Sequence, residues 1–168
     1  MQYTSAEANK LLKQTEEELS QLIVNENQSK EFIMSLGEDI EDIRPEYNYE
    51  ETTNKKKELY KKIRTIKHAI NVFNSVTIIP EFNMTIDEML IYLPQLSTRK
   101  NQLSSMASRL PKTRENNRYG SSSFIDYRIA NYDIDTVKQD LEKVTTELYK
   151  AHLALDMVNT TVKFEINL

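Results

Sequence analysis

The chain has 168 residues, a net charge of −4 and a mean hydropathy of −0.62, which together predict one soluble domain. It contains no cysteine, so disulfides, thiol catalysis and cysteine-ligated metals are excluded. The negative net charge argues against nucleic acid as the main ligand. Only two glycines are present, which leaves few residues for tight turns and predicts few, long elements.

The chain begins with an acidic amphipathic segment and has no basic start followed by an apolar run. Its purely apolar runs are only a few residues long. We therefore expect a cytoplasmic protein without a signal peptide or a membrane span.

The first predicted element is a long helix over residues 5–36. Its apolar face is marked by Leu12, Leu19, Leu22, Ile23, Ile33 and Leu36. The face weakens at residues 25–30, and Gly37 is typical of a helix end. An acidic loop is predicted over 38–54, because Pro45 disfavours helical backbone at the residue before it.

Two segments carry the apolar repeat of a coiled coil, with spacings that alternate between four and three. The first, a helix predicted over 55–73, has Leu59, Ile63, Ile66, Ile70 and Phe73. The second, a helix predicted over 135–158 with Asp135 as its N-cap, has Val137, Leu141, Val144, Leu148, Ala151, Leu155 and Val158. Such stripes require partner helices, so we expect homo-oligomers with long helices.

A further helix is predicted over 85–110, with Thr85 as N-cap and Pro111 as its end. Pro94 lies inside this segment and should kink or divide the helix. Lys100 occupies a position where the repeat calls for an apolar residue. It is expected either to pair with a carboxylate or to extend its ammonium group to water.

Three short strands complete the prediction. Residues 76–79 are rich in β-branched side chains, and residues 124–131 and 161–166 alternate apolar with polar residues. A polar loop is predicted over 112–123. We expect the strands to pair as a small antiparallel β element at one end of an antiparallel helical hairpin or bundle.

Charge is distributed unevenly along the chain. Residues 1–51 hold 13 acids and 4 bases, whereas residues 55–67 hold seven bases and one acid. The simplest interpretation is an acidic first helix lying along a basic second helix. The alternative is a surface for phosphates or nucleic acid.

Residues 109–128 are the second basic region, with tyrosines between the bases. Its bases and aromatics are Arg109, Lys112, Arg114, Arg118, Tyr119, Tyr127 and Arg128. Basic residues interleaved with aromatics bind single-stranded nucleic acid or phosphates. The same residues can contact an acidic region of a neighbouring subunit. We predict a ligand or subunit contact at Arg114, Arg118, Tyr119 and Arg128.

The residues give no sign of catalysis or of a bound cofactor. His152 has Asp156 four residues on, which makes one pair where a metal site needs three or four ligands. The Glu-x-x-His motif of di-metal bundles and a glycine-rich phosphate loop are both absent. We expect no enzyme activity, no metal and no cofactor.

The second half of the chain resembles the septicolysin-like family of small bacterial helical proteins of unknown function. The resemblance lies in residues 84–90 (MTIDEML), which open a long helix, in 119–122 (YGSS) and in 133–135 (DID). It spans roughly residues 59–168. It implies a helical hairpin or bundle that assembles into homo-oligomers, and it implies no catalytic residues. The family name suggests a pore-forming toxin, which this chain disfavours because no apolar hairpin is visible.

The sequence therefore predicts a mainly α protein of long antiparallel helices with a small antiparallel β element. Its role is interpreted as structural, in a homo-oligomer. The alternative is nucleic-acid or phosphate binding through the bases of 55–67 and 109–128.

Overall fold

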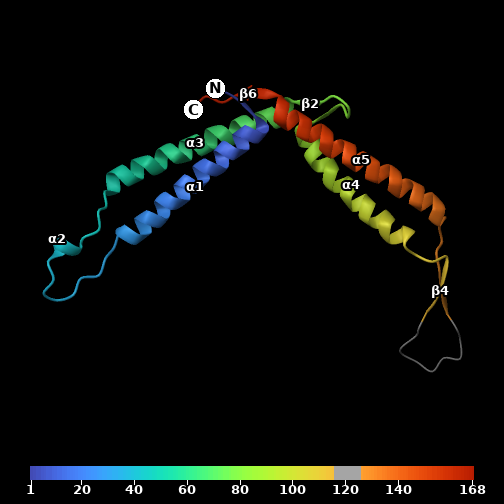
Figure 1. Ribbon diagram of the computed structural model, residues 1–168, viewed down its shortest axis with the longest axis horizontal. Helices are drawn as coiled ribbons and strands as arrows, with labels where there is room; N and C mark the ends of the chain where they lie inside the picture. Colours follow the sequence, from blue (N-terminus) through green and yellow to red (C-terminus); the bar gives the residue numbers. More distant parts are fainter. Residues whose placement is uncertain (116–125) are drawn as a thin grey trace. The chain divides into compact units, whose positions relative to one another are not determined.

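The computed structural model describes residues 1–115 and 126–168 and is 68% helical, which confirms the mainly α prediction (Figure 1). The chain divides into two compact units, where the sequence led us to expect one domain. The terminal unit contains Met1–Thr77 and Met157–Leu168. The middle unit contains Ile78–Asp156. Each unit is built around a pair of long helices.

In the terminal unit, helices α1 (Ser5–Ser29) and α3 (Tyr49–Val76) lie side by side and run antiparallel (Figure 1). Two ion pairs show the direction. Lys56 Nζ lies 2.7 Å from Glu26 Oε2, and Lys67 Nζ lies 2.7 Å from Glu16 Oε1. The acidic first helix therefore lies along the basic second helix, as the charge pattern predicted.

The two ends of the chain form a strand pair in the same unit. Strand β1 (Gln2–Thr4) pairs antiparallel with β6 (Lys163–Glu165), with Tyr3 opposite Phe164. The amide of Ile166 donates to the carbonyl of Met1 at 2.9 Å, and the amino group of Met1 donates to the carbonyl of Ile166 at 3.1 Å. This pairing closes one end of the α1–α3 hairpin.

The core of the terminal unit gathers at the strand end of that hairpin. Ala8, Ile66, Ile70 and Ile166 are buried together, and Tyr3, Leu11, Leu12, Ala69 and Phe164 pack against them. The ring of Phe164 also stacks on Phe73, with ring centroids 4.4 Å apart. Away from the strands the core thins, so that Leu22, Leu59 and Ile63 are only half-buried.

The first helix is shorter than predicted, because α1 ends at Ser29 rather than near Leu36. Polar residues at 25–30 leave the next turn without a core to face, and the apolar residues of 32–36 lie exposed in the loop instead. The acidic loop holds the short helix α2 (Ile40–Ile43). Helix α3 starts at Tyr49, before the predicted 55, since Asn48 Oδ1 accepts from the amide of Glu51.

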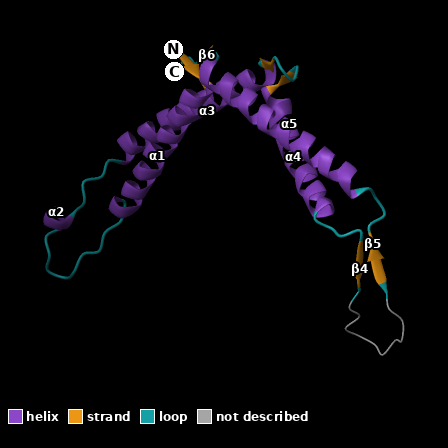
Figure 2. Ribbon diagram, turned by 45° about the vertical axis from the view of Figure 1, so that its right-hand side comes forward, coloured by secondary structure: helices purple, strands orange, loops and turns teal. Residues whose placement is uncertain are grey.

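In the middle unit, helices α4 (Ile86–Ala107) and α5 (Ile134–Thr161) lie side by side (Figures 1 and 2). Tyr92 on α4 donates to Glu147 on α5, and the hydroxyl of Tyr132 donates to the carbonyl of Met106 at 3.0 Å. These two contacts show that the helices run antiparallel. Their buried residues follow the predicted repeat: Ile86, Met89, Leu93 and Leu96 on α4, and Val137, Val144, Ala151 and Leu155 on α5.

The start of α4 was predicted correctly, and the predicted N-cap of α5 was two residues late. Thr85 caps α4, and Thr85 and Glu88 form a capping box. On α5 the cap is Asp133 rather than Asp135, because its Oδ1 accepts from the amides of Asp135 and Thr136. Pro94 does not divide α4, which runs continuously through it.

Over residues 1–115 and 126–168 the strands form three separate two-stranded pairs rather than one shared β element. Strand β2 (Ile78–Ile79) pairs with β3 (Met84–Thr85), and β4 (Lys112–Arg114) pairs with β5 (Tyr127–Ile129). The three predicted strands are each shorter than expected. Their partner strands, at residues 2–4, 84–85 and 112–114, were not predicted from the sequence. The predicted loop of 112–123 thus begins with a strand.

The buried core predicts which apolar residues control stability. Replacing Ile66, whose side chain is fully buried, by Ala should lower the free energy of unfolding of the terminal unit by about 3 kcal/mol. Val72→Ala is the matched control on the same helix, since Val72 is 46% exposed and should cost under about 0.5 kcal/mol. Urea unfolding followed by circular dichroism measures both. Equal costs would contradict this core.

Lys100 gives a second prediction. It is half-buried on α4 and forms no ion pair with any residue that the structure describes. Lys100→Leu should leave the melting temperature unchanged or raise it, because the change adds apolar burial and breaks no ion pair. Gln102→Leu, at an exposed position of the same helix, should give no gain. A lower melting temperature for Lys100→Leu would show that the ammonium group specifies the helix register.

Candidate interaction site

The predicted site lies on the β4–β5 hairpin of the middle unit (Figure 2). Lys112 is opposite Ile129, Thr113 is opposite Arg128, and Arg114 is opposite Tyr127. Two backbone bonds extend the hairpin: the amide of Glu115 donates to the carbonyl of Asp126 at 2.9 Å, and that of Ala130 donates to the carbonyl of Pro111 at 3.0 Å.

Strand geometry divides these residues between two faces. Because successive side chains of a strand point to opposite faces, Lys112, Arg114, Tyr127 and Ile129 share one face, which we call the basic face. The ammonium group of Lys112 lies 3.9 Å from the centre of the Tyr127 ring, a cation–π contact. Neither Lys112 nor Arg114 forms an ion pair within residues 1–115 and 126–168.

The opposite face carries Arg128, whose charge is balanced. Its guanidinium donates to both carboxylate oxygens of Glu115, at 2.6 and 3.1 Å. This hydrogen bond, together with the charge of Glu115, raises the pKa of Arg128. Both side chains are well exposed, so the pair fixes the arginine in place and adds little stability.

Of the four predicted contact residues the structure describes two, and these two do not converge. Arg114 and Arg128 lie on opposite faces of the hairpin, and Arg118 and Tyr119 lie outside the described residues. Sequence reasoning grouped the bases by proximity along the chain. The period-two alternation of a strand at 112–114 would have separated them, but three residues were too few to recognise it.

An open hollow of about 560 Å³ lies at the base of the hairpin. Its walls include the apolar side chains of Leu110 and Ile129, which are 65% and 67% exposed, the charged side chain of Arg109, and the Arg128–Glu115 pair. Tyr132 joins this wall and ties it to α4 through Met106. The hairpin thus combines cations with apolar surface.

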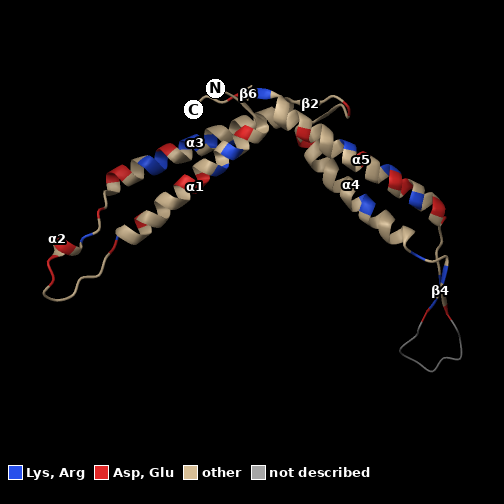
Figure 3. Ribbon diagram, in the orientation of Figure 1, with Lys and Arg blue, Asp and Glu red and all other residues tan. Residues whose placement is uncertain are grey.

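The other basic region, residues 55–67 on α3, is partly neutralised within the terminal unit (Figure 3). Lys55 pairs with Glu51 at 2.6 Å, and Lys56 and Lys67 pair with α1 as described above. The bases that form no ion pair with a described residue are Lys57, Lys61, Lys62 and Arg64.

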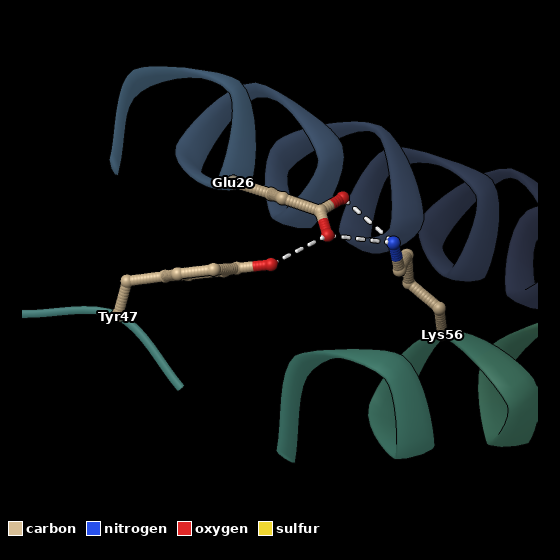
Figure 4. A network of polar contacts seen from close by, with 3 residues as sticks. All are labelled: Glu26, Tyr47 and Lys56. Atoms are coloured by element: carbon tan, nitrogen blue, oxygen red, sulfur yellow. Dashed lines mark hydrogen bonds and ion pairs between the residues drawn. The ribbon is translucent and has the colours of Figure 1, made fainter. Parts of the chain in front are cut away.

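Glu26, Lys56 and Tyr47 form a polar network that fixes the acidic loop to the helices (Figure 4). Lys56 Nζ donates to both oxygens of Glu26, at 2.7 and 2.8 Å, and the Tyr47 hydroxyl donates to Glu26 at 3.1 Å. The hydrogen bond from Lys56 lowers the pKa of Glu26, and that to Glu26 raises the pKa of Lys56. The pKa of the Tyr47 hydroxyl is raised mainly by desolvation and, to a smaller extent, by its hydrogen bond to Glu26.

Beyond this network the loop exposes apolar side chains. We call residues 31–42 the acidic tip: Phe32, Ile33, Met34 and Leu36 are exposed there, Ile33 and Leu36 almost completely. Its acids are Glu31, Glu38, Asp39, Glu41 and Asp42, with no base among them. A turn holds it, in which the amide of Ser35 donates to Glu38 at 2.7 Å and Gly37 adopts φ +98°.

The histidines do not build a metal centre. His68 and His152 are both exposed. Within the described ranges no group of three or more His, Asp or Glu side chains is placed to hold a metal ion. No described helix combines the length and apolar character needed to cross a membrane.

Comparisons with known proteins leave the function open. No protein-family model and no curated protein matches the sequence. One solved structure is similar: the crystal structure of a functionally unknown conserved protein from Corynebacterium diphtheriae, with a TM-score of 0.59 and 20% identity. The match covers 98% of this chain and 100% of that one. At this identity the likeness shows a shared fold only.

The Glu26 network predicts a pH dependence. Because the folded state lowers the pKa of Glu26, its stabilisation is present at neutral pH and is lost in acid, as the pH falls from the ordinary range of a glutamate carboxyl through the lowered pKa of Glu26. Glu26→Gln should therefore lower the melting temperature at pH 7, and the difference from wild type should shrink in acid.

Glu17→Gln is the control on the same helix, since Glu17 is exposed and lies 3.9 Å from Lys13. It should change the melting temperature little at either pH. A Glu26→Gln deficit that stays constant from neutral to acidic pH would contradict the assigned role of the carboxylate.

Proposed function

We propose that this protein is a structural, non-enzymatic interaction protein that assembles into homo-oligomers. The supporting observation is its exposed surface of 12,799 Å². A compact monomer of 19.7 kDa would expose about 8,600 Å². The excess is what two-helix units produce, because each helix buries only one face, and association with further copies would cover it.

The expected contacts are not the repeat residues that first suggested an oligomer. Ile66, Ile70, Val144 and Ala151 are buried within their own units and are not free for another chain. The exposed apolar residues are more suitable. They include Ile33 and Leu36 in the loop of 31–42 and Leu110 and Ile129 at the β4–β5 hairpin, all of which are well exposed.

The septicolysin-like resemblance agrees with this proposal, since it too implies homo-oligomers of helical hairpins. It carries no enzymatic residue, and we propose none. Membership of that family remains part of the proposal.

Nucleic-acid or phosphate binding is the second candidate. The observation in its favour is that Lys112 and Arg114 share the basic face with Tyr127 and form no ion pair with described residues. Against it stand the net charge of −4 and the engagement of the Tyr127 ring by Lys112. The second candidate therefore ranks below assembly.

Sedimentation velocity separates the two. We expect the protein to be at least a dimer at micromolar concentration, and to sediment unchanged when single-stranded RNA is added. A monomer throughout the micromolar range would refute assembly. Binding of RNA that weakens steeply with added salt would favour the second candidate, because neutralised phosphates release their counterions.

A further inference from the structure

We infer that the acidic tip of one copy docks onto the β4–β5 hairpin of a second copy, so that the protein associates head to tail. This inference rests on the proposed homo-oligomer and names the two surfaces that would build it. The tip belongs to the terminal unit and the hairpin to the middle unit, so every chain carries both halves of the contact.

The acidic tip and the hairpin carry opposite charges. The tip holds five acids and no base over residues 31–42. Of these five acids, only Glu41 forms an ion pair with a described residue, Arg44, at 3.2 Å. On the hairpin, Lys112 and Arg114 share a face and form no ion pair with a described carboxylate, and Arg109 lies beside the hollow. An acidic tip repels nucleic acid and anionic lipid, and it is attracted to a basic protein surface.

Both surfaces also expose apolar side chains. Ile33 is 95% exposed, and Leu36 is as exposed as in an extended chain. The turn from Ser35 to Glu38 presents Leu36 in one defined conformation, which reduces the entropy lost on docking. The hollow at the hairpin base offers the matching apolar walls, Leu110 and Ile129, and its volume of about 560 Å³ accommodates such side chains.

Such a contact joins two different patches. An interface of this kind is heterologous, and it produces rings if the rotation closes or open chains if it does not. A heterologous contact also responds to mutation differently from a two-fold dimer contact. Blocking one of the two patches on a chain leaves the other patch of that chain able to bind.

Two variants with exposed substitutions test this property. The tip variant carries Ile33→Ser and Leu36→Ser, and the hairpin variant carries Lys112→Glu and Arg114→Glu. Circular dichroism melting should show both as folded as wild type. Each variant alone should sediment as a monomer. An equimolar mixture should recover a dimer and nothing larger, since one intact tip then meets one intact hairpin.

The control variant, Lys57→Glu with Lys61→Glu, makes the same change in charge at exposed positions of α3 and should assemble like wild type. If tip and hairpin variants both remain oligomeric, the docking inference is wrong while the proposed assembly stands. Monomeric variants whose mixture stays monomeric would also overturn it. A monomeric wild type would refute the second copy as the occupant. Cross-links between tip and hairpin that form only within one chain would refute it as well.

Discussion

The structure depends on one constraint: a unit of two helices can bury only a single apolar face of each helix. In the terminal unit that face runs through Ala8, Ile66 and Ile70, and in the middle unit through Met89, Leu93 and Val144. Among the described residues of each unit, no third layer covers the outer faces. Apolar residues such as Tyr149 and Leu153 therefore remain in water, and the exposed surface is large for the mass. This shortage of burial is the physical reason for expecting partners.

Because the core is thin, polar interactions determine where each element begins and ends. Capping boxes start α1 at Thr4 and α4 at Thr85, and strand pairing joins the chain ends beside the core. At the far end of the α1–α3 hairpin, where Leu22 and Leu59 are only half-buried, the Glu26–Lys56–Tyr47 network replaces apolar contacts. The loop beyond it is held by this network and by its own turn, so its apolar residues are presented outward.

Acidic and basic residues are concentrated in different segments of the chain, and only some of them form ion pairs between packed elements. Lys56 and Lys67 are matched by acids of α1, and Arg128 is matched by Glu115. Lys112 and Arg114 on the hairpin and most acids of the tip form no such ion pairs among the described residues. Opposite charges on two surfaces that also expose apolar side chains are the complementarity on which the proposed docking rests.

The sequence alone determined the helical class, the repeat that is buried, the Thr85 cap and the pairing of an acidic helix with a basic one, because periodicity and charge are local properties of the chain. It did not determine that 2–4, 84–85 and 112–114 are strands, since strands this short exist only through their partners. Nor did it place Arg114 and Arg128 on opposite faces of a hairpin. Tertiary structure decided these points. It also decided that the apolar repeats are buried within each unit, because the sequence does not specify which helix packs against which.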